Sequence, residues 1–311
     1  MENCELIIIG AGAAGLAAGI YGTRSGLKTL ILEEKMAGGT MADAPIIENY
    51  PGFQSINGRE LAQKMVVHCR SVDVEIHELE KVISLDLKSN KKTVKTDKTT
   101  YEAKVVIFAC GTHHHELGVS GEKEFRGRGV SYCGVCDGPL FQNRRVLVVG
   151  GGNSAVITAL YVAELASEVK LSHRRSVLRA EEALVKALKN KQNVEILWNT
   201  ELKEIKGEQV VSKVILLNNK TEATKELEFD GVFIQVGETP NSELAKKAGV
   251  NVDEKGYITV DVRQHTNTAG VYAAGDVTNH PVKQVGTAVG QGITAALEAY
   301  GYIRQPYHYK P

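Results

Sequence analysis

The sequence predicts an α/β protein built from two three-layer domains, the second inserted into the first. A short apolar run, a glycine-rich turn and a helix-length segment occur twice, beginning at Leu6–Ile9 and at Val146–Val149. Each copy is followed by a second strand-like run, Thr29–Leu32 and Val169–Ser172, which predicts two β-α-β units with parallel strands. The chain has 311 residues, enough for two domains of about 150 residues each.

Composition narrows the possible functions. The chain has 37 Lys and Arg against 37 Asp and Glu, so it has no surplus of positive charge for nucleic acid or an anionic membrane. Five cysteines do not suit a secreted disulfide framework, and the apolar stretch Leu6–Ile20 follows an acidic start and contains glycines. We therefore expect a soluble, cytoplasmic protein with no membrane span.

The first glycine turn predicts a dinucleotide site. Gly10, Gly12 and Gly15 have the spacing that allows a tight turn, close approach of a pyrophosphate and packing of helix on strand. The helix start then faces the phosphates. Glu33 closes the second strand, where a carboxylate binds ribose hydroxyls.

The second glycine turn, Gly150 to Ala155, is followed by cations instead of an acid. His173 lies 23 residues after Gly150, as Glu33 does after Gly10, and Arg174, Arg175 and Arg179 come next. Several cations suit a 2′-phosphate, which favours NADPH over NADH. The alternative is a solvated basic start of a helix.

The rest of the chain indicates how the domains are connected. Strands are expected within residues 72–109, which end at Val105–Ala109, and at Val210–Leu217 and Gly231–Val236 with a polar turn between the latter two. Residues 112–118 and 237–241 are expected to cross between domains. This predicts one discontinuous domain of residues 1–112 and 243–311, and an inserted domain of residues 116–240.

A close pair of cysteines, Cys133 and Cys136, precedes the second unit and is followed by Asp137. Two intervening residues let both sulfurs share one turn, which suits a redox disulfide. A zinc site is the alternative, with His113, His114 and His115 as the other ligands. Cys4, Cys69 and Cys110 need no function, because free cysteine packs as a small hydrophobic residue.

Over nearly its whole length the sequence resembles the low-molecular-weight thioredoxin reductases of bacteria and archaea, which are FAD-dependent pyridine nucleotide-disulfide oxidoreductases. The marks of this resemblance are the two glycine turns, Glu48–Gly52, Cys133-x-x-Cys136-Asp137-Gly138, His173-Arg174-Arg175, Gly237-x-x-Pro240-Asn241 and Gly275-Asp276-Val277. The resemblance implies a homodimer with two Rossmann-like domains, FAD in the discontinuous domain and NADPH in the inserted one. NADPH reduces the flavin, the flavin reduces the disulfide, and the dithiol reduces thioredoxin or a thioredoxin-like protein.

The resemblance also implies roles for individual residues. Cys136 would face the flavin, Cys133 would attack the protein substrate, and Asp137 would protonate a leaving thiolate. The expected cofactor-binding residues are Gly10, Gly12, Ala14, Gly15, Glu33, Gly39, Asn49, Gly111, Gly275, Asp276, Lys283 and Gln284 for FAD, and Gly150, Gly152, Asn153, Ser154, Ala155, His173, Arg174, Arg175 and Arg179 for NADPH. No metal site is expected.

Two positions depart from the family pattern. Thr40 stands where the family has glutamine after two glycines, and Lys283 stands where it has arginine before the last helix. Lysine keeps the charge and loses the planar fork of arginine. The alternatives are a glutaredoxin-like or peroxiredoxin-like acceptor, a ferredoxin-type electron donor, or a redox sensor that holds FAD without turnover.

Overall fold

The computed structural model describes residues 2–44 and 46–305. The chain forms two compact units, one of the residues up to His113 and from Thr239 onward, the other of His114–Glu238; we refer to them as unit 1 and unit 2. The two crossings pair with each other as β9 (Thr112–His114) and β18 (Glu238–Pro240). Residues at both crossings were expected to form linkers, and short strands stand there instead.

Unit 1 is built around a parallel sheet of five strands in the order β19-β8-β2-β3-β4. The central strand β2 (Leu6–Ile9) is completely apolar, as a strand covered on both faces must be. The other strands are β3 (Thr29–Leu32), β4 (Glu75–His77), β8 (Val105–Phe108) and β19 (Val271–Ala273).

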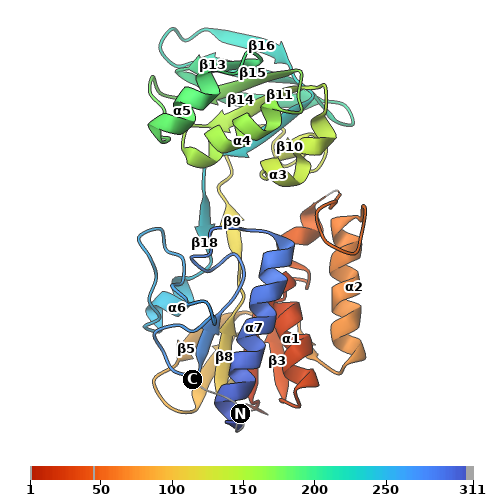
Figure 1. Ribbon diagram of the computed structural model, residues 1–311, viewed down its shortest axis with the longest axis vertical. Helices are drawn as coiled ribbons and strands as arrows, with labels where there is room; N and C mark the ends of the chain where they lie inside the picture. Colours follow the sequence, from red (N-terminus) through yellow and green to blue (C-terminus); the bar gives the residue numbers. More distant parts are fainter. Residues whose placement is uncertain (1, 45, 306–311) are drawn as a thin grey trace. The chain divides into compact units, whose positions relative to one another are not determined.

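Alternate residues of β2 enter two different cores, which gives unit 1 three layers. Leu6 and Ile8 pack under the helices α1 (Ala13–Arg24), α2 (Gly58–Ser71) and α7 (Val285–Arg304), which lie on one face of the sheet (Figure 1). Ile7 and Ile9 face the second core, which includes residues of a four-stranded sheet. That sheet has the order β1-β7-β6-β5, formed by β1 (Glu2–Asn3), β5 (Val82–Asp86), β6 (Lys92–Thr96) and β7 (Thr100–Ala103).

Unit 2 repeats this plan. Its parallel sheet has the order β10-β17-β11-β12-β13, formed by β10 (Val130–Ser131), β11 (Arg145–Gly150), β12 (Glu168–His173), β13 (Val194–Trp198) and β17 (Gly231–Gln235). Val146 and Val148 pack under α4 (Asn153–Ala163) and α5 (Glu182–Lys189). Leu147 and Val149 pack on the opposite side, in a core shared with an antiparallel sheet of β14 (Thr200–Gly207), β15 (Val211–Asn218) and β16 (Thr224–Glu228).

The predicted fold class is confirmed, with two Rossmann-like three-layer domains. One local expectation was wrong: residues 224–226, assigned to a polar turn of residues 218–226, belong to the edge strand β16 (Thr224–Glu228). Four of its five residues are exposed, so the strand lacks the alternation of apolar and polar residues that would predict it. Charged, exposed residues are common on edge strands, because one side of such a strand has no neighbouring strand. Short elements complete the fold, namely η1 (Gly39–Asp43), α3 (Gly134–Asp137), η2 (Gly138–Phe141) and α6 (Glu243–Lys247). In the described parts of the chain, no helix is both long and apolar enough to span a membrane.

Candidate functional site

The first glycine turn can be made only by glycine. Gly10 has a φ of +106°, and a Cβ there would lie 2.4 Å from the carbonyl oxygen of Ala109. A Cβ on Gly15 would lie 1.9 Å from the carbonyl oxygen of Gly10. The strand β2 therefore turns directly into α1, with the helix pressed against the turn.

Helix α1 begins at this turn without a side-chain cap. Gly12 occupies the N-cap position, and the first turn holds no acidic residue, so amide donors at the start of the helix remain available to an anion. The carboxylate of Glu33 lies beside the turn, where it accepts hydrogen bonds from the amides of Ala11 at 2.7 Å and Lys35 at 2.9 Å. A Cβ on Gly39 would lie 2.8 Å from the Cα of Gly12, which brings the two backbones together.

The C-terminal part of unit 1 reaches the same helix. A Cβ on Gly275 would lie 2.9 Å from the Cβ of Ala14, and one on Gly292 would lie 2.1 Å from the Ala14 carbonyl oxygen. The buried side chain of Gln291 accepts a hydrogen bond from the amide of Gly275 at 2.6 Å. The predicted Gly275–Asp276 segment thus lies beside the first glycine turn, although 265 residues separate Gly10 from Gly275.

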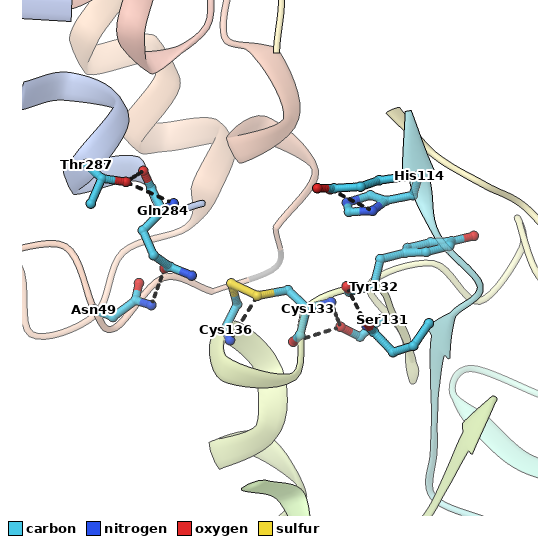
Figure 2. The surroundings of a disulfide bond; sticks show 10 residues. Asn49, His114, Ser131, Tyr132, Cys133, Cys136, Gln284 and Thr287 are labelled. Atoms are coloured by element: carbon cyan, nitrogen blue, oxygen red, sulfur yellow. Dashed lines mark hydrogen bonds and ion pairs between the residues drawn. A yellow bond between two sulfur atoms is a disulfide. The ribbon is translucent and has the colours of Figure 1, made fainter. Parts of the chain in front are cut away.

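Polar residues expected to hold the flavin occupy the start of α7. Asn49 donates a hydrogen bond to Gln284 at 3.0 Å, and Gln284 forms a capping box with Thr287 (Figure 2). The ammonium of Lys283 donates to the carbonyl oxygens of Asp276 at 2.9 Å and Thr278 at 2.5 Å. Lysine at this position therefore holds the loop before α7 through these two hydrogen bonds.

Gly111 lies in unit 1, just before the first crossing. Its φ is +62°, and its carbonyl oxygen accepts a hydrogen bond from the amide of Asn241, while the Asn241 side chain donates to the Cys110 carbonyl oxygen at 2.8 Å. From the sequence, no role was expected for the side chains of Asn241 and Gln291. A glutamine within a helix of small residues is the kind of signal that could have revealed Gln291.

The second glycine turn has the same construction in unit 2. Gly150 has a φ of +156°, and a Cβ there would lie 2.3 Å from the carbonyl oxygen of Gln235. Gly152 is the uncapped N-cap of α4, and a Cβ on it would meet nothing within 4 Å. Asn153 exchanges two hydrogen bonds with Glu181, while Ser154 is exposed and Ala155 is buried. The start of α4 is open to an anion.

His173 does not supply the positive charge expected of it. Its ring is buried beneath the glycine turn, where a Cβ on Gly151 would lie 2.2 Å from the ring, and Nε2 pairs with the Val177 carbonyl oxygen at 2.9 Å. Burial, and then the positive charges of Arg175 and Arg179, lower the pKa of His173, so the ring is neutral at pH 7. A charge run in the sequence cannot show that one of its members points inward.

The three arginines expected to bind a 2′-phosphate follow His173 along the chain. Arg174, Arg175 and Arg179 are exposed, and the amide of Arg179 donates to the Gly151 carbonyl oxygen at 2.7 Å. The arginine segment is thereby tied to the glycine turn. The positive charge beside the second turn comes from these guanidinium groups.

Cys133 and Cys136 form a disulfide, with Cα atoms 5.3 Å apart (Figure 2). Cys133 is the N-cap of α3, and its Sγ accepts a hydrogen bond from the amide of Cys136 at 3.2 Å. A donor aimed at this sulfur stabilises a thiolate there after reduction. Burial raises the pKa of the Cys69 and Cys110 thiols to about 12 each, so these two cysteines stay protonated.

Asp137 follows Cys136 in the same short helix. Burial raises the pKa of its carboxyl group, and a hydrogen bond with Ser131 acts in the opposite direction. Its buried Oδ1 has no hydrogen-bond partner. A carboxyl group in such surroundings favours the protonated form and can give a proton to a nearby thiolate.

The three consecutive histidines are not gathered into a metal site. Nδ1 of His113 pairs with Asn241 at 2.7 Å, and the ring of His114 stacks on Tyr132. Within residues 2–44 and 46–305, no group of three or more His, Cys, Asp or Glu side chains is arranged to hold a metal ion.

Comparison with known proteins agrees with this geometry. Residues 4–292 match the family described as pyridine nucleotide-disulphide oxidoreductase. The chain is 40% identical over 304 residues to the thioredoxin reductase of Bacillus subtilis, which covers 97% of this chain and 95% of that protein. The crystal structure of thioredoxin reductase from Streptococcus pyogenes is 39% identical with a TM-score of 0.94, covering 97% and 99% of the two chains. A more distant structure, a ferredoxin-flavin thioredoxin reductase from Clostridium acetobutylicum, is 34% identical with a TM-score of 0.53, covering 98% and 99%.

Proposed function

This chain belongs to the pyridine nucleotide-disulphide oxidoreductase family and to its thioredoxin reductases, and from this premise we propose that it reduces the disulfide of thioredoxin or a thioredoxin-like protein. Electrons pass from NADPH through FAD and the Cys133–Cys136 disulfide to that partner. The observation that carries the proposal is the disulfide itself, with Cys133 at the start of a helix and its sulfur facing a backbone donor.

Unit 1 has the residues that suit FAD. The uncapped start of α1 leaves backbone donors for a pyrophosphate, and close backbone contacts at Gly10, Gly15 and Gly39 hold the turn beside it. Glu33 lies at the same turn as a partner for ribose hydroxyls. Asn49 and Gln284 stand at the start of α7, whose dipole favours negative charge. A bound flavin supplies two-electron transfer between a nicotinamide and a disulfide.

Unit 2 has the residues that suit NADPH. The uncapped start of α4 at Gly152 would bind the pyrophosphate, and Arg174, Arg175 and Arg179 would hold the 2′-phosphate. The buried ring of His173 supports both the glycine turn and the arginine segment, because it packs against Gly151 and pairs with the carbonyl oxygen of Val177.

The dithiol form would carry out disulfide exchange. The Cys133 thiolate attacks one sulfur of the partner's disulfide, forming a mixed disulfide and releasing the other sulfur as a thiolate. Asp137 holds the proton that this leaving thiolate takes up, since burial favours its protonated form. Cys136 then attacks Cys133, releasing the reduced partner and restoring the disulfide. By the family resemblance, Cys136 is also the thiol that meets the flavin.

We further assign the protein as a homodimer, following the family resemblance. Size-exclusion chromatography with light scattering tests this assignment, because a monomer and a dimer differ twofold in mass.

A ferredoxin-type donor is the second candidate for the electron source, because one structural relative is a ferredoxin-flavin thioredoxin reductase. The exposed arginines beside the second glycine turn favour NADPH. An enzyme fed by ferredoxin alone has no use for cations that read a 2′-phosphate.

An anaerobic titration of the purified flavoprotein with NADPH, and separately with NADH, tests the proposal. We expect two hydride equivalents per subunit, NADPH preferred, and two new thiols, mapped to Cys133 and Cys136 by mass spectrometry. Uptake of one equivalent without new thiols would refute the disulfide as a redox centre. Failure of both nucleotides to reduce the flavin, with reduction by ferredoxin, would support the second candidate.

A further inference from the structure

Unit 2 contains a buried carboxylate, that of Glu122, which is surrounded by hydrogen-bond donors and has no role in the disulfide exchange described above. Glu122 is 1% exposed, and its two oxygens accept hydrogen bonds from the amides of Leu117 at 3.0 Å, Gly118 at 2.7 Å and Val119 at 3.4 Å. The fourth donor is the hydroxyl of Tyr132, at 2.7 Å. Because an ionised carboxylate only accepts hydrogen bonds, this set of donors satisfies it.

The side chain of Tyr132 is held on several sides. Its ring stacks on His114 with centroids 5.1 Å apart, and the guanidinium of Arg126 lies 5.3 Å from the ring centroid (Figure 2 shows His114 and Tyr132). Burial, and then the hydrogen bond to Glu122, raise the pKa of the phenol, which stays protonated and remains a donor. The phenol therefore forms a charge-assisted hydrogen bond with a carboxylate that is buried from water.

Tyr132 directly precedes the redox-active Cys133. Its carbonyl oxygen accepts a hydrogen bond from the side chain of Gln235 at 2.7 Å, and the amide of Cys133 donates to the Ser131 hydroxyl at 3.0 Å. The backbone that leads into Cys133 is thus fixed from the strand side, and the Tyr132 side chain fixes it to Glu122.

We propose that Tyr132 and Glu122 are positioning residues for the redox pair, which hold Cys133 where its sulfur meets Cys136 and thereby set the equilibrium between dithiol and disulfide. This inference rests on the proposed function in one respect, namely that Cys133 and Cys136 are a redox pair. The geometry that carries it is the four-donor shell of Glu122 and its bond to the residue before Cys133.

The sign of the effect follows from the exchange reaction. A small dithiol reduces the protein disulfide, giving the protein dithiol and the oxidised, cyclic form of the reagent, so two sulfur–hydrogen bonds and one disulfide are conserved on each side. A preorganised Cys133 raises the effective concentration of one thiol at the other and favours the disulfide. Loosening Tyr132 therefore favours the dithiol, and the reduction potential becomes less negative.

The test is the variant Tyr132→Phe, which keeps the ring and its stacking and removes the hydroxyl. The full-length protein is equilibrated with reduced and oxidised dithiothreitol in defined ratios, quenched and alkylated, and the oxidised fraction of the Cys133–Cys136 peptide is read by mass spectrometry. We expect a roughly tenfold shift of the equilibrium towards the dithiol, equal to about 30 mV for a two-electron couple.

Unit 1 offers a matched control. The hydroxyl of Tyr101, itself 1% exposed, donates to the buried carboxylate of Glu80 at 2.8 Å. Tyr101→Phe removes the same kind of bond from the same kind of pair, so both variants should be destabilised to a similar degree in thermal unfolding. The exchange equilibrium should stay at the wild-type value in Tyr101→Phe alone.

A wild-type equilibrium in Tyr132→Phe, a shift towards the disulfide, or an equal shift in both variants would overturn the proposal. Glu122→Gln gives a second reading, because its amide group faces donors and must also shift the equilibrium towards the dithiol. The assay needs neither nucleotide nor thioredoxin. A shifted equilibrium in a chain that fails the NADPH titration would leave this inference standing and remove the proposed function.

Discussion

Gly151→Ala should destabilise unit 2 more than the neighbouring Gly152→Ala does. A Cβ on Gly151 would lie 2.2 Å from Cε1 and from Nδ1 of His173, and a Cβ on Gly152 would meet nothing within 4 Å. The His173 ring is buried and bonded to the Val177 carbonyl oxygen, so it cannot move aside without breaking that bond. The two glycines are adjacent in sequence and differ in what their added methyl group would meet.

The magnitude follows from the cost of overpacking. Forcing an extra methyl group into a filled site costs about 1–3 kcal/mol, so Gly151→Ala should lower the free energy of unfolding by that amount. At an N-cap position, alanine in place of glycine costs less than about 1 kcal/mol, which sets the limit for Gly152→Ala. Binding of NADP⁺ should also weaken in Gly151→Ala, because the amide of Arg179 donates to the Gly151 carbonyl oxygen.

Urea denaturation followed by tryptophan fluorescence measures this difference. The chain has a single tryptophan, Trp198, which lies on β13 opposite His173 of β12 and therefore reports on unit 2 beside the altered site. Equal unfolding midpoints for the two variants would refute the claim that the His173 ring fills the space that a Cβ on Gly151 would need. If Gly152→Ala lowered the free energy of unfolding by more than about 1 kcal/mol, a further constraint would act at the start of α4.

Three further predictions concern the disulfide, the nucleotide and the acid stability of unit 1. Cys133→Ser and Cys136→Ser should each abolish disulfide reduction while retaining FAD, measured by thioredoxin turnover and flavin absorbance; full activity of Cys136→Ser would contradict the electron path. Arg175→Ala should raise the KM for NADPH by roughly tenfold, since a phosphate contact of about 1.4 kcal/mol is lost, and leave the KM for NADH unchanged; parallel changes would argue against a 2′-phosphate contact. The Arg304 guanidinium, which hydrogen-bonds both oxygens of Glu5, lowers the pKa of that carboxyl from 4.5 to about 2. The pair therefore stabilises the fold above about pH 4.5 and ceases to do so as the pH falls to about 2, so Glu5→Gln should be less stable than wild type at pH 7 and equal to it at pH 2 in thermal melts.

The fold could be predicted from the sequence because its signals are local and repeated. Apolar runs such as Leu6–Ile9 and Val146–Val149 end in glycine turns, and both parallel sheets grow from these strands. The strand at Thr224–Glu228 could not be found in this way, because an exposed edge strand need not alternate apolar and polar residues.

Residues at the candidate site also differ in how much a local sequence pattern reveals about them. Gly10 and Gly150 have backbone conformations that favour glycine, so their roles could be anticipated from spacing alone. Gln291 and Asn241 bond to Gly275 and Gly111 across long stretches of sequence, and no local pattern shows which distant residue each one meets.

The sequence by itself determined the two glycine turns, the cysteine pair and the arginines after the second turn, because each is a short pattern whose chemistry depends on neighbouring residues. Only the tertiary structure decided that His173 lies buried and neutral under Gly151, and that Glu122 joins the segment 117–119 to Tyr132. Burial and hydrogen bonding depend on which distant residues the folded chain brings together. A side chain's charge, and what it holds in place, are therefore properties of the packing around it.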